Sequence, residues 1–192
     1  GKDSVVAAHM LTRYGVRSAV CEESFVFDRQ IASMRQVADQ IGLRVTYKSE
    51  RDDDWLRARK EIIFTSDTAA RAKSFADRHQ RTIKRHARAT GSTVVFFGRR
   101  RDENSVKAPI YEAHGRAQCH PLAGWTLKDI WAYFDAHRIT IPWVYTTRFG
   151  EIEGNAPFYT MRADDVGGHR AAWDLVGSLD PTITPERYGV TL

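Results

Sequence analysis

The first four residues of the chain are Gly1, Lys2, Asp3 and Ser4, residue types that hold phosphate groups at the start of a helix. An apolar run follows at once, from Val5 to Leu11, so the four residues lie where a helix begins. A helix N-terminus presents N–H groups without intrahelical acceptors and the positive end of the helix dipole. Such an end binds anions readily, and the opening stretch therefore predicts an anion-binding helix start.

A second polar cluster, GRRRDEN, runs from Gly98 to Asn104 and follows the apolar stretch STVVFF. A short, nearly all-apolar stretch is typical of a parallel strand that is covered on both faces. Ligands of open α/β sheets bind outside the carboxyl ends of the strands. Because guanidinium groups pair with phosphate or sulfate oxygens in bidentate fashion, three arginines at this point favour a polyanion site over a plain surface turn.

The spacing of apolar residues predicts that helices and strands alternate along the chain. We expect a helix from about Ser4 to Tyr14 that ends at Gly15. Next come a buried strand at RSAVC, a helix that ends at Gly42, and a strand at LRVTY. A long helix from about Ser66 to Ala89 precedes the STVVFF strand.

The remaining segments follow the arginine cluster. We expect a short hairpin that turns at His114 and Gly115, then a helix capped by Thr126 with Asp129. The chain beyond about residue 145 is rich in Gly and Pro and is expected to form a lid or a packing arm. The whole chain, 1–192, is expected to be a single domain, with its core at about 1–145 and the arm at about 146–192, because domains commonly run about 100 to 200 residues.

The long helix carries basic residues along one face: Arg71, Lys73, Arg78, Arg81, Lys84, Arg85 and Arg88. Such a run is typical of a solvated helix face, and contact with nucleic acid or an acidic partner is the alternative. The net charge of +5 mildly favours anionic partners but is too small to indicate a DNA-binding protein by itself.

Composition limits the class of protein. The sequence is 42% hydrophobic and 28% charged, which indicates a globular chain, and no apolar stretch approaches the roughly 20 residues of a membrane helix. Two cysteines, Cys21 and Cys119, are too few for a disulfide framework, so we expect a cytoplasmic, reducing location. The spacing of His114, Cys119 and His120 fits no usual zinc pattern, and no metal site is expected.

Four stretches, in order along the chain, resemble the phosphoadenylyl sulfate (PAPS) reductase branch of the adenine nucleotide alpha hydrolase, or PP-loop ATP pyrophosphatase, superfamily. GKDS matches the last four positions of the Ser-Gly-Gly-Lys-Asp-Ser pyrophosphate loop. GRRRDEN resembles Gly-x-Arg-Arg-Glu/Asp-x-Ser and places Arg100 and Arg101 on the paired arginines. CEESFVFDRQ keeps only Phe27 of its family stretch. HPLAGWTLKDIWAYFDAHRITIPW resembles a segment shared with the small subunit of ATP sulfurylase.

The resemblance implies a Rossmann-like (HUP-type) fold, an open and mainly parallel sheet with helices on both faces. The nucleotide would lie at its carboxyl edge, with the adenine read by main chain at Ala19, Val20 and Cys21. Its phosphates would lie over Gly1 to Ser4, and Gly98, Arg100 and Arg101 would also bind the nucleotide. Lys2, Arg100 and Arg101 would stabilise charge in the transition state, Ser4 would donate to phosphate oxygens, and Asp3 would order the loop or a Mg²⁺ ion.

The implied activity is that of an enzyme acting on ATP or PAPS at the phosphate or sulfate chain, an oxidoreductase or a transferase. No Cys follows Cys119, so we expect neither the usual cysteine nucleophile of the family nor an iron–sulfur cluster, which needs four thiolates. A catalytically inactive nucleotide-binding or partner-binding module is the alternative. Nucleic acid, a second protein chain and a homo-oligomer stay open as partners.

The resemblance also raises a question about the start of the chain. The family loop joins a first strand to the first helix, and this sequence has the helix without the strand. We therefore expect either a fragment or a strand supplied by another chain; if neither holds, the central sheet has an unfilled position and the phosphate loop a free amino group. Replacement of Arg100 or Arg101 by Ala is expected to weaken nucleotide binding by about 1.5 to 3 kcal/mol and to change stability little.

Overall fold

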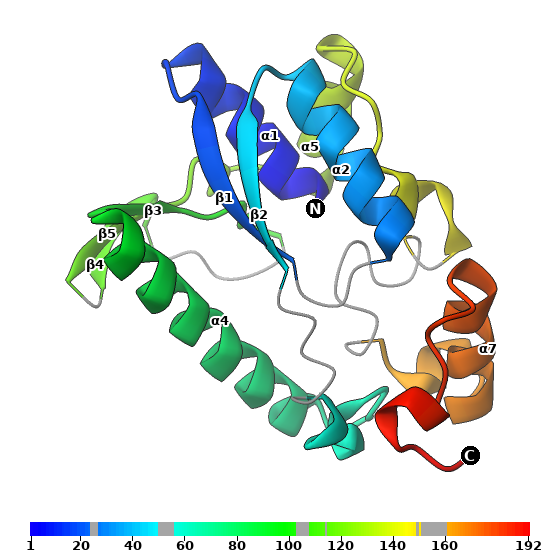
Figure 1. Ribbon diagram of the computed structural model, residues 1–192. Coiled ribbons are helices and arrows are strands. Elements are labelled where there is room, and N and C mark those ends of the chain that lie inside the picture. Colours follow the sequence, from blue (N-terminus) through cyan, green and yellow to red (C-terminus); the bar gives the residue numbers. More distant parts are fainter. Residues whose placement is uncertain (24–26, 50–55, 103–107, 114, 149, 151–160) are drawn as a thin grey trace. The chain divides into compact units, whose positions relative to one another are not determined.

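A computed structural model describes residues 1–23, 27–49, 56–102, 108–113, 115–148, 150 and 161–192 (Figure 1). The chain divides into two compact units. The first unit contains Gly1–Cys21, Met34–Thr46 and Gln80–Pro142, and the second contains Glu22–Ser33, Tyr47–His79 and Trp143–Leu192. Among the described residues, no helix is both long enough and apolar enough to cross a membrane.

The elements alternate as the apolar pattern predicts. The α-helices are α1 (Lys2–Arg13), α2 (Asp28–Gln40), α4 (Thr68–Thr90), α5 (Leu127–Ala136) and α7 (His169–Leu179). The strands are β1 (Ser18–Glu23), β2 (Arg44–Ser49), β3 (Val94–Phe96), β4 (Ile110–Ala113) and β5 (Arg116–Cys119). Short 3-10 helices occupy Lys60–Ile62, Trp143–Thr146, Ala163–Val166 and Glu186–Tyr188. Helix α1 begins two residues earlier than predicted, so its first turn contains Lys2, Asp3 and Ser4.

The strands form a mixed α/β fold with parallel pairing, as predicted. Strand β1 pairs with β2, and the other three strands have the order β3-β5-β4. Strands β3 and β5 are parallel, with Phe96 opposite Cys119. Strands β4 and β5 are antiparallel, with Ile110 also opposite Cys119, which confirms the predicted hairpin. Gly115 takes a φ of 69° in its turn, and His114 lies outside the described residues.

The expectation that the STVVFF strand is covered on both faces is wrong for the described structure. Val94 and Phe96 are 40% and 46% exposed. Strand β3 is at the edge of its three-stranded sheet, and the buried residue is Phe97, which directly follows the strand. An all-apolar stretch cannot reveal which of its faces is covered, because both faces have the same composition.

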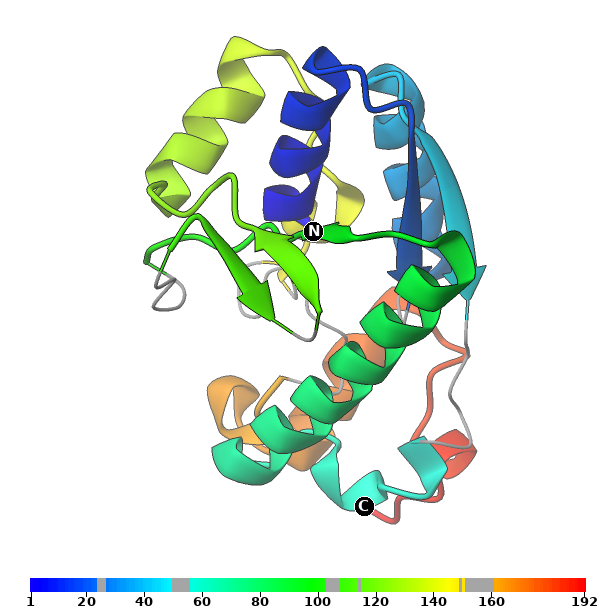
Figure 2. The same ribbon diagram turned by 90° about the vertical axis from the view of Figure 1, so that its left-hand side faces the viewer.

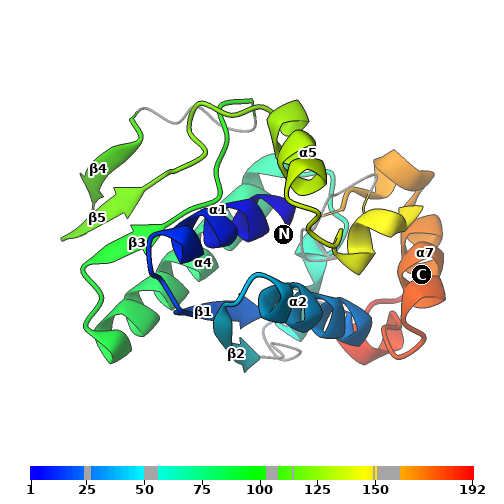
Figure 3. The same cartoon turned by 90° about the horizontal axis from the view of Figure 1, so that it is seen from above.

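The core of the first unit is built by α1, α5 and the carboxyl half of α2 (Figure 3). Each helix has an apolar face at helical spacing, and the three faces meet in one cluster. Its buried members are Val5, Val6, Ala7, Val37, Leu122, Ile130, Phe134 and Ile139. A hydrogen bond of 3.0 Å between His9 Nδ1 and the Tyr133 hydroxyl also joins α1 to α5. The start of α1 is therefore held on a rigid base.

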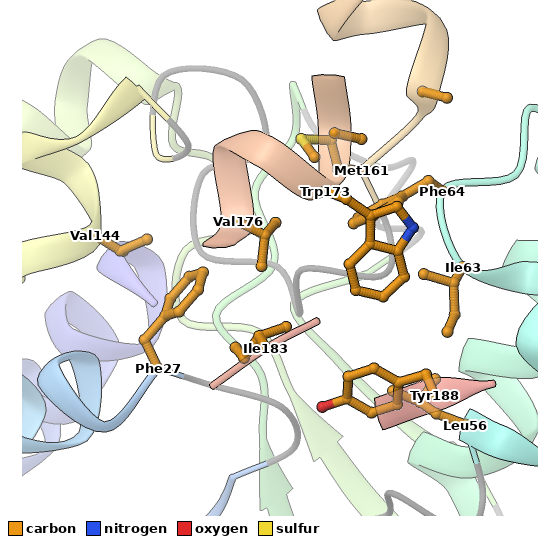
Figure 4. Close-up of a cluster of buried hydrophobic side chains, with 12 residues drawn as sticks. Phe27, Leu56, Ile63, Phe64, Val144, Met161, Trp173, Val176, Ile183 and Tyr188 are labelled. Atoms are coloured by element: carbon orange, nitrogen blue, oxygen red, sulfur yellow. The ribbon is translucent and has the colours of Figure 1, made fainter. Parts of the chain in front are cut away.

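The second unit has a separate core in which α7 packs on aromatic and aliphatic side chains (Figure 4). Phe64 and Trp173 meet edge to face with ring centroids 5.0 Å apart. Phe64 is fully buried at a φ of 57°, and its carbonyl accepts a hydrogen bond from Ala163 N. Helix α7 was not predicted, because Gly167 and Gly168 directly before it indicate a loop.

Candidate functional site

The amino end of α1 has no side-chain cap. Gly1 is the N-cap residue, and the first intrahelical bond runs from Val5 N to the Gly1 carbonyl over 3.0 Å. The N–H groups that precede Val5 therefore have no acceptor within the helix. Together with the helix dipole they favour an anion at this position.

Three charged side chains are buried beside this helix end. Lys2, Asp3 and Arg100 are only 8%, 7% and 6% exposed. Lys2 Nζ lies 3.0 Å from Asp3 Oδ2, and Arg100 Nε lies 2.5 Å from Asp3 Oδ1. Each carboxylate oxygen thus lies beside one cation, and the contact of Arg100 Nε with Asp3 Oδ1 is an ion pair without hydrogen-bond geometry. We call these three side chains the charged cluster.

Arg100 also connects the charged cluster to α5. Its guanidinium forms an ion pair with Asp102 Oδ1. The second oxygen of Asp102 accepts a hydrogen bond of 2.7 Å from Leu127 N, in the first turn of α5. The predicted cap of α5 is confirmed, with Thr126 and Asp129 bonded reciprocally. We call residues 98–102 the arginine loop. One chain of contacts therefore runs from α1 through this loop to α5.

Gly98 brings the two predicted phosphate-binding clusters into direct contact. A Cβ atom at Gly98 would lie 2.8 Å from both Asp3 C and Ser4 N, which is closer than real Cβ contacts allow. The backbone of the arginine loop therefore lies directly against the first turn of α1. No residue larger than glycine fits here without a shift of the backbone.

The three consecutive arginines have different environments. Arg100 is buried in the charged cluster, whereas Arg101 is exposed. The Arg101 N–H donates to the Trp125 carbonyl over 3.3 Å. Hydrogen bonds from Thr126, and then the Arg101 charge, lower the pKa of Asp129. The guanidinium of Arg99 lies 5.2 Å from the ring centroid of Phe97.

The burial of Arg100 contradicts the expectation that Arg100→Ala changes stability little. Its removal would leave the buried Asp3 with one of its two cations missing, so we no longer expect Arg100→Ala to leave stability unchanged. Because the Arg101 side chain is exposed, we still expect Arg101→Ala to change stability little.

The predicted adenine-reading residues lie within β1. Ala19, Val20 and Cys21 are consecutive residues of this strand, which pairs with β2 (Figure 1). The side chains of Val20 and Cys21 lie outside the described part. The role of these residues stays a prediction.

His120 was not predicted as a site residue. It is 2% exposed and stacks between Phe97 and Tyr111, with ring centroids 5.1 and 5.3 Å away. Neither ring nitrogen has a hydrogen-bond partner among the described residues. Burial, and then the charge of Arg99, lowers the pKa of His120. Nothing in the local sequence indicates that this polar residue points inward.

Among the described residues, no group of three or more His, Cys, Asp or Glu side chains is arranged so that it could hold a metal ion. Cys119 and His120 are adjacent in sequence, and His120 is far more buried than Cys119.

Comparisons with known proteins identify the fold type and the family of this chain. A crystal structure of PAPS reductase from Candida auris, a phosphate complex, superposes with a TM-score of 0.54. The match covers 76% of this chain and 73% of that one at 16% identity, which establishes an α/β fold of the same type. Residues 1–156 match the phosphoadenosine phosphosulfate reductase domain, and the chain belongs to this family.

The curated relatives are named after a different enzyme from the family and the solved structure. Subunit 2 of sulfate adenylyltransferase from Mycobacterium sp. (strain JLS) is 25% identical, and its counterpart from strain KMS is 24% identical. In both cases 76% of this chain is covered, but only 55% of the relative. The chain thus spans about half the length of these curated relatives.

Proposed function

We propose that this chain is an enzyme that binds ATP with its phosphates over the first turn of α1. A nucleophilic acceptor molecule attacks the α-phosphorus and takes up the AMP group, and the bond to pyrophosphate breaks. PAPS bound in the same way, with chemistry at the sulfate, is the second candidate. The proposal uses the family membership of the chain for the class of ligand. The residue roles come from the geometry of the charged cluster.

The observation that carries the proposal is the contact of Gly98 with the Asp3–Ser4 peptide. Gly98 and the first turn of α1 are 95 residues apart in sequence, and they lie within van der Waals distance at the point where the helix dipole favours an anion. A phosphate chain placed over this helix end would meet N–H donors and the Lys2 ammonium together.

The roles of the residues follow from their burial. The Lys2 ammonium lies 3.0 Å from Asp3 Oδ2 and carries three donor hydrogens, so contact with Asp3 is compatible with donation to a phosphate oxygen. As the bond to the α-phosphorus breaks, charge grows on the departing pyrophosphate, and the Lys2 contact strengthens. Arg100 acts as a positioning residue, because it contacts Asp3 and Asp102 and holds the loop against α1.

The described residues do not form a Mg²⁺ site of their own. Both oxygens of Asp3 face cations, and Asp102 bonds Arg100 and Leu127. A Mg²⁺ ion needs free carboxylate oxygens or substrate phosphates. We therefore assign no step to a metal ion.

A second protein chain is part of the proposal. The curated relatives are named as subunits, and this chain covers 55% of their length. We propose that the working enzyme includes a partner subunit.

Calorimetric titration with ATP and with PAPS, followed by a pyrophosphate-release assay, tests the proposal. Lys2→Ala should lower the rate of pyrophosphate release more than it weakens ATP binding. Lys128→Ala removes an exposed cation of α5 and serves as the matched control. Binding without any pyrophosphate release, with or without candidate partner subunits, would favour the inactive module. No change on replacement of Lys2 would refute the phosphate site.

A further inference from the structure

Three aromatic rings stack on one side of the three-stranded sheet, and the middle ring belongs to His120. It lies between Phe97, which follows β3, and Tyr111 of β4, and its plane is within 11° and 10° of theirs. All three residues belong to the first unit. Figure 2 shows β3, β4 and β5 in green beside the amino end of the chain, which is marked N. The stack therefore lies close to the proposed phosphate site.

Phe97 connects this stack to the start of α1. Its N–H donates to the Cys119 carbonyl over 2.9 Å, so its backbone belongs to the ladder between β3 and β5. The next residue, Gly98, lies directly against the first turn of α1. His120 is held in turn, since its N–H donates to the Pro109 carbonyl over 2.7 Å. The stack thus fixes the ring of the residue that directly precedes Gly98.

His120 carries a cost in stability that packing alone does not require. It is 2% exposed, and neither Nδ1 nor Nε2 has a hydrogen-bond partner among the described residues. A buried polar atom without a partner destabilises a fold. Phenylalanine has a ring of similar size and would stack without this cost. Exceptions to local packing rules are expected at functional sites, so His120 is a candidate for a role beyond packing.

The surroundings of His120 oppose a positive charge. Burial, and then the charge of Arg99 in the loop after β3, lowers the pKa of His120. On β4, Tyr111 contributes its phenol ring, and Glu112 is exposed on the other face because successive side chains alternate. On β5, the buried neighbour on the same side is the uncharged Gln118. A protonated ring would gain a second N–H donor and would meet no carboxylate among these neighbours.

We propose that His120 is a positioning residue of the ATP site, whose neutral ring holds Phe97, and thereby Gly98, against the first turn of α1. This inference rests on the proposed function for the identity of the ligand. When the ring takes up a proton, the charge must reach water, and the stack with Phe97 opens. Gly98 then loses its support, and the helix end no longer presents the same surface to the phosphate chain.

The coupling between His120 and ATP is reciprocal. If protonation of His120 weakens ATP binding, bound ATP disfavours the protonated ring by the same free energy. A single proton changes the affinity by at most about tenfold per pH unit, and the loss occurs below the pKa of the free protein. Because this pKa is lowered, ATP affinity should be full at pH 7.5 and should fall only below the ordinary value of 6.5.

Calorimetric titration with ATP from pH 7.5 downward compares the parent with His120→Phe, which keeps a ring in the stack and cannot take up a proton. Both chains meet the same ligand, so titration of the ATP phosphates cancels in the ratio of the two affinities. His169→Asn removes an exposed histidine of the second unit and is the matched control. His9→Gln is a second control, because His9 lies on α1 and also has a lowered pKa.

A second measurement needs no ATP. In an NMR titration of the free chain, the amide signals of Gly98 and Ser4 should change with the same midpoint as the His120 ring. In His120→Phe these amide signals should stay constant over the same range. Addition of ATP should move the His120 midpoint to lower pH. Urea unfolding at each pH identifies the range in which the parent and His120→Phe are folded.

From pH 7.5 to one unit below the His120 midpoint, the ratio of parent to His120→Phe affinity should fall by up to about tenfold, while both controls follow the parent. A constant ratio overturns the inference, and ATP binding at pH 7.5 then still supports the proposed function. Absence of ATP binding at pH 7.5 overturns the proposed function, and the amide signals then decide whether His120 holds Gly98 against α1. Unfolding of the parent before the His120 ring titrates would show a role in stability alone and would also overturn the inference.

Discussion

Arg100 holds its charge in a buried position between two carboxylates. It is 6% exposed and pairs with Asp3 and Asp102, so its guanidinium fork joins α1 to the loop that leads into α5. The planar fork allows two partners at fixed angles, which the single ammonium of lysine cannot reproduce. This residue therefore links the stability of the fold with the geometry of the proposed phosphate site.

We predict that Arg100→Ala lowers the free energy of unfolding by about 3 to 5 kcal/mol, since it leaves a buried carboxylate short of a partner. Arg101→Ala should change it by less than about 0.5 kcal/mol, because Arg101 is exposed. Urea unfolding of the two variants measures the difference. If the two variants are equally stable, Arg100 is not buried in the folded protein as described.

His120 is a second buried residue whose charge state affects the stability of the fold. Its lowered pKa means that the folded chain disfavours the protonated imidazole. Below the ordinary pKa of 6.5 the unfolded chain takes up a proton more readily, so stability should fall as the pH drops through this range. The pKa of His9 is lowered too, by burial and by the charges of His137 and Arg13, and acts in the same direction.

We predict that His120→Phe reduces the loss of stability between pH 7.5 and 5.5, by up to about 1.4 kcal/mol per pH unit. Phenylalanine keeps the ring stack with Phe97 and Tyr111 and removes two unsatisfied nitrogens. The exposed His169, replaced by Asn, is the control. Urea unfolding at both pH values gives the comparison, and an acid dependence equal to that of the parent would show that His120 is not held neutral by burial.

At the scale of elements, the decisive contact joins the loop after β3 to the first turn of α1. Gly98 permits it, because any Cβ there would meet Asp3 and Ser4 backbone atoms at 2.8 Å. Backbone atoms cannot rotate aside as a long side chain can. The two elements would have to separate to make room.

We predict that Gly98→Ala costs about 1 to 3 kcal/mol of stability, in the range of an overpacked core, and that ATP affinity falls as well. Gly124→Ala is the matched control, since a Cβ at Gly124 meets nothing within 4 Å. Thermal unfolding and calorimetric titration of both variants provide the two readouts. Retention of full ATP affinity in a folded Gly98→Ala variant would separate the arginine loop from the nucleotide site.

For the whole molecule, the two units share continuous helices. Helix α2 passes from the second unit to the first between Ser33 and Met34, and α4 does so between His79 and Gln80. A helix is cooperative along its length, so melting in one unit removes support from the other. The prediction of a single domain is compatible with this connection and stays a prediction.

We predict one cooperative thermal transition, with equal calorimetric and van't Hoff enthalpies. Differential scanning calorimetry measures both, and Trp173→Ala should shift the single transition as a whole, because it opens a cavity in the core of the second unit. Two resolved transitions, only one of which moves in Trp173→Ala, would show that the units unfold as separate domains.

The sequence by itself determined the features that depend on local pattern. Apolar spacing, end signals and the Thr126–Asp129 box predicted α1, α2, α4, α5 and the hairpin, because helix and strand periods and caps are encoded within a few residues. The order of the four motifs indicated the family, which the match over residues 1–156 confirmed.

Only the tertiary structure decided which residues meet. Asp3 and Arg100 are 97 positions apart, and no local pattern states that one neutralises the other or that Arg101 stays exposed. Long-range contacts also decide that β3 has an exposed face, that His120 points inward and that α7 packs on the second core. Burial depends on what the rest of the chain places over a surface, and that is a property of long-range contacts rather than of periodicity.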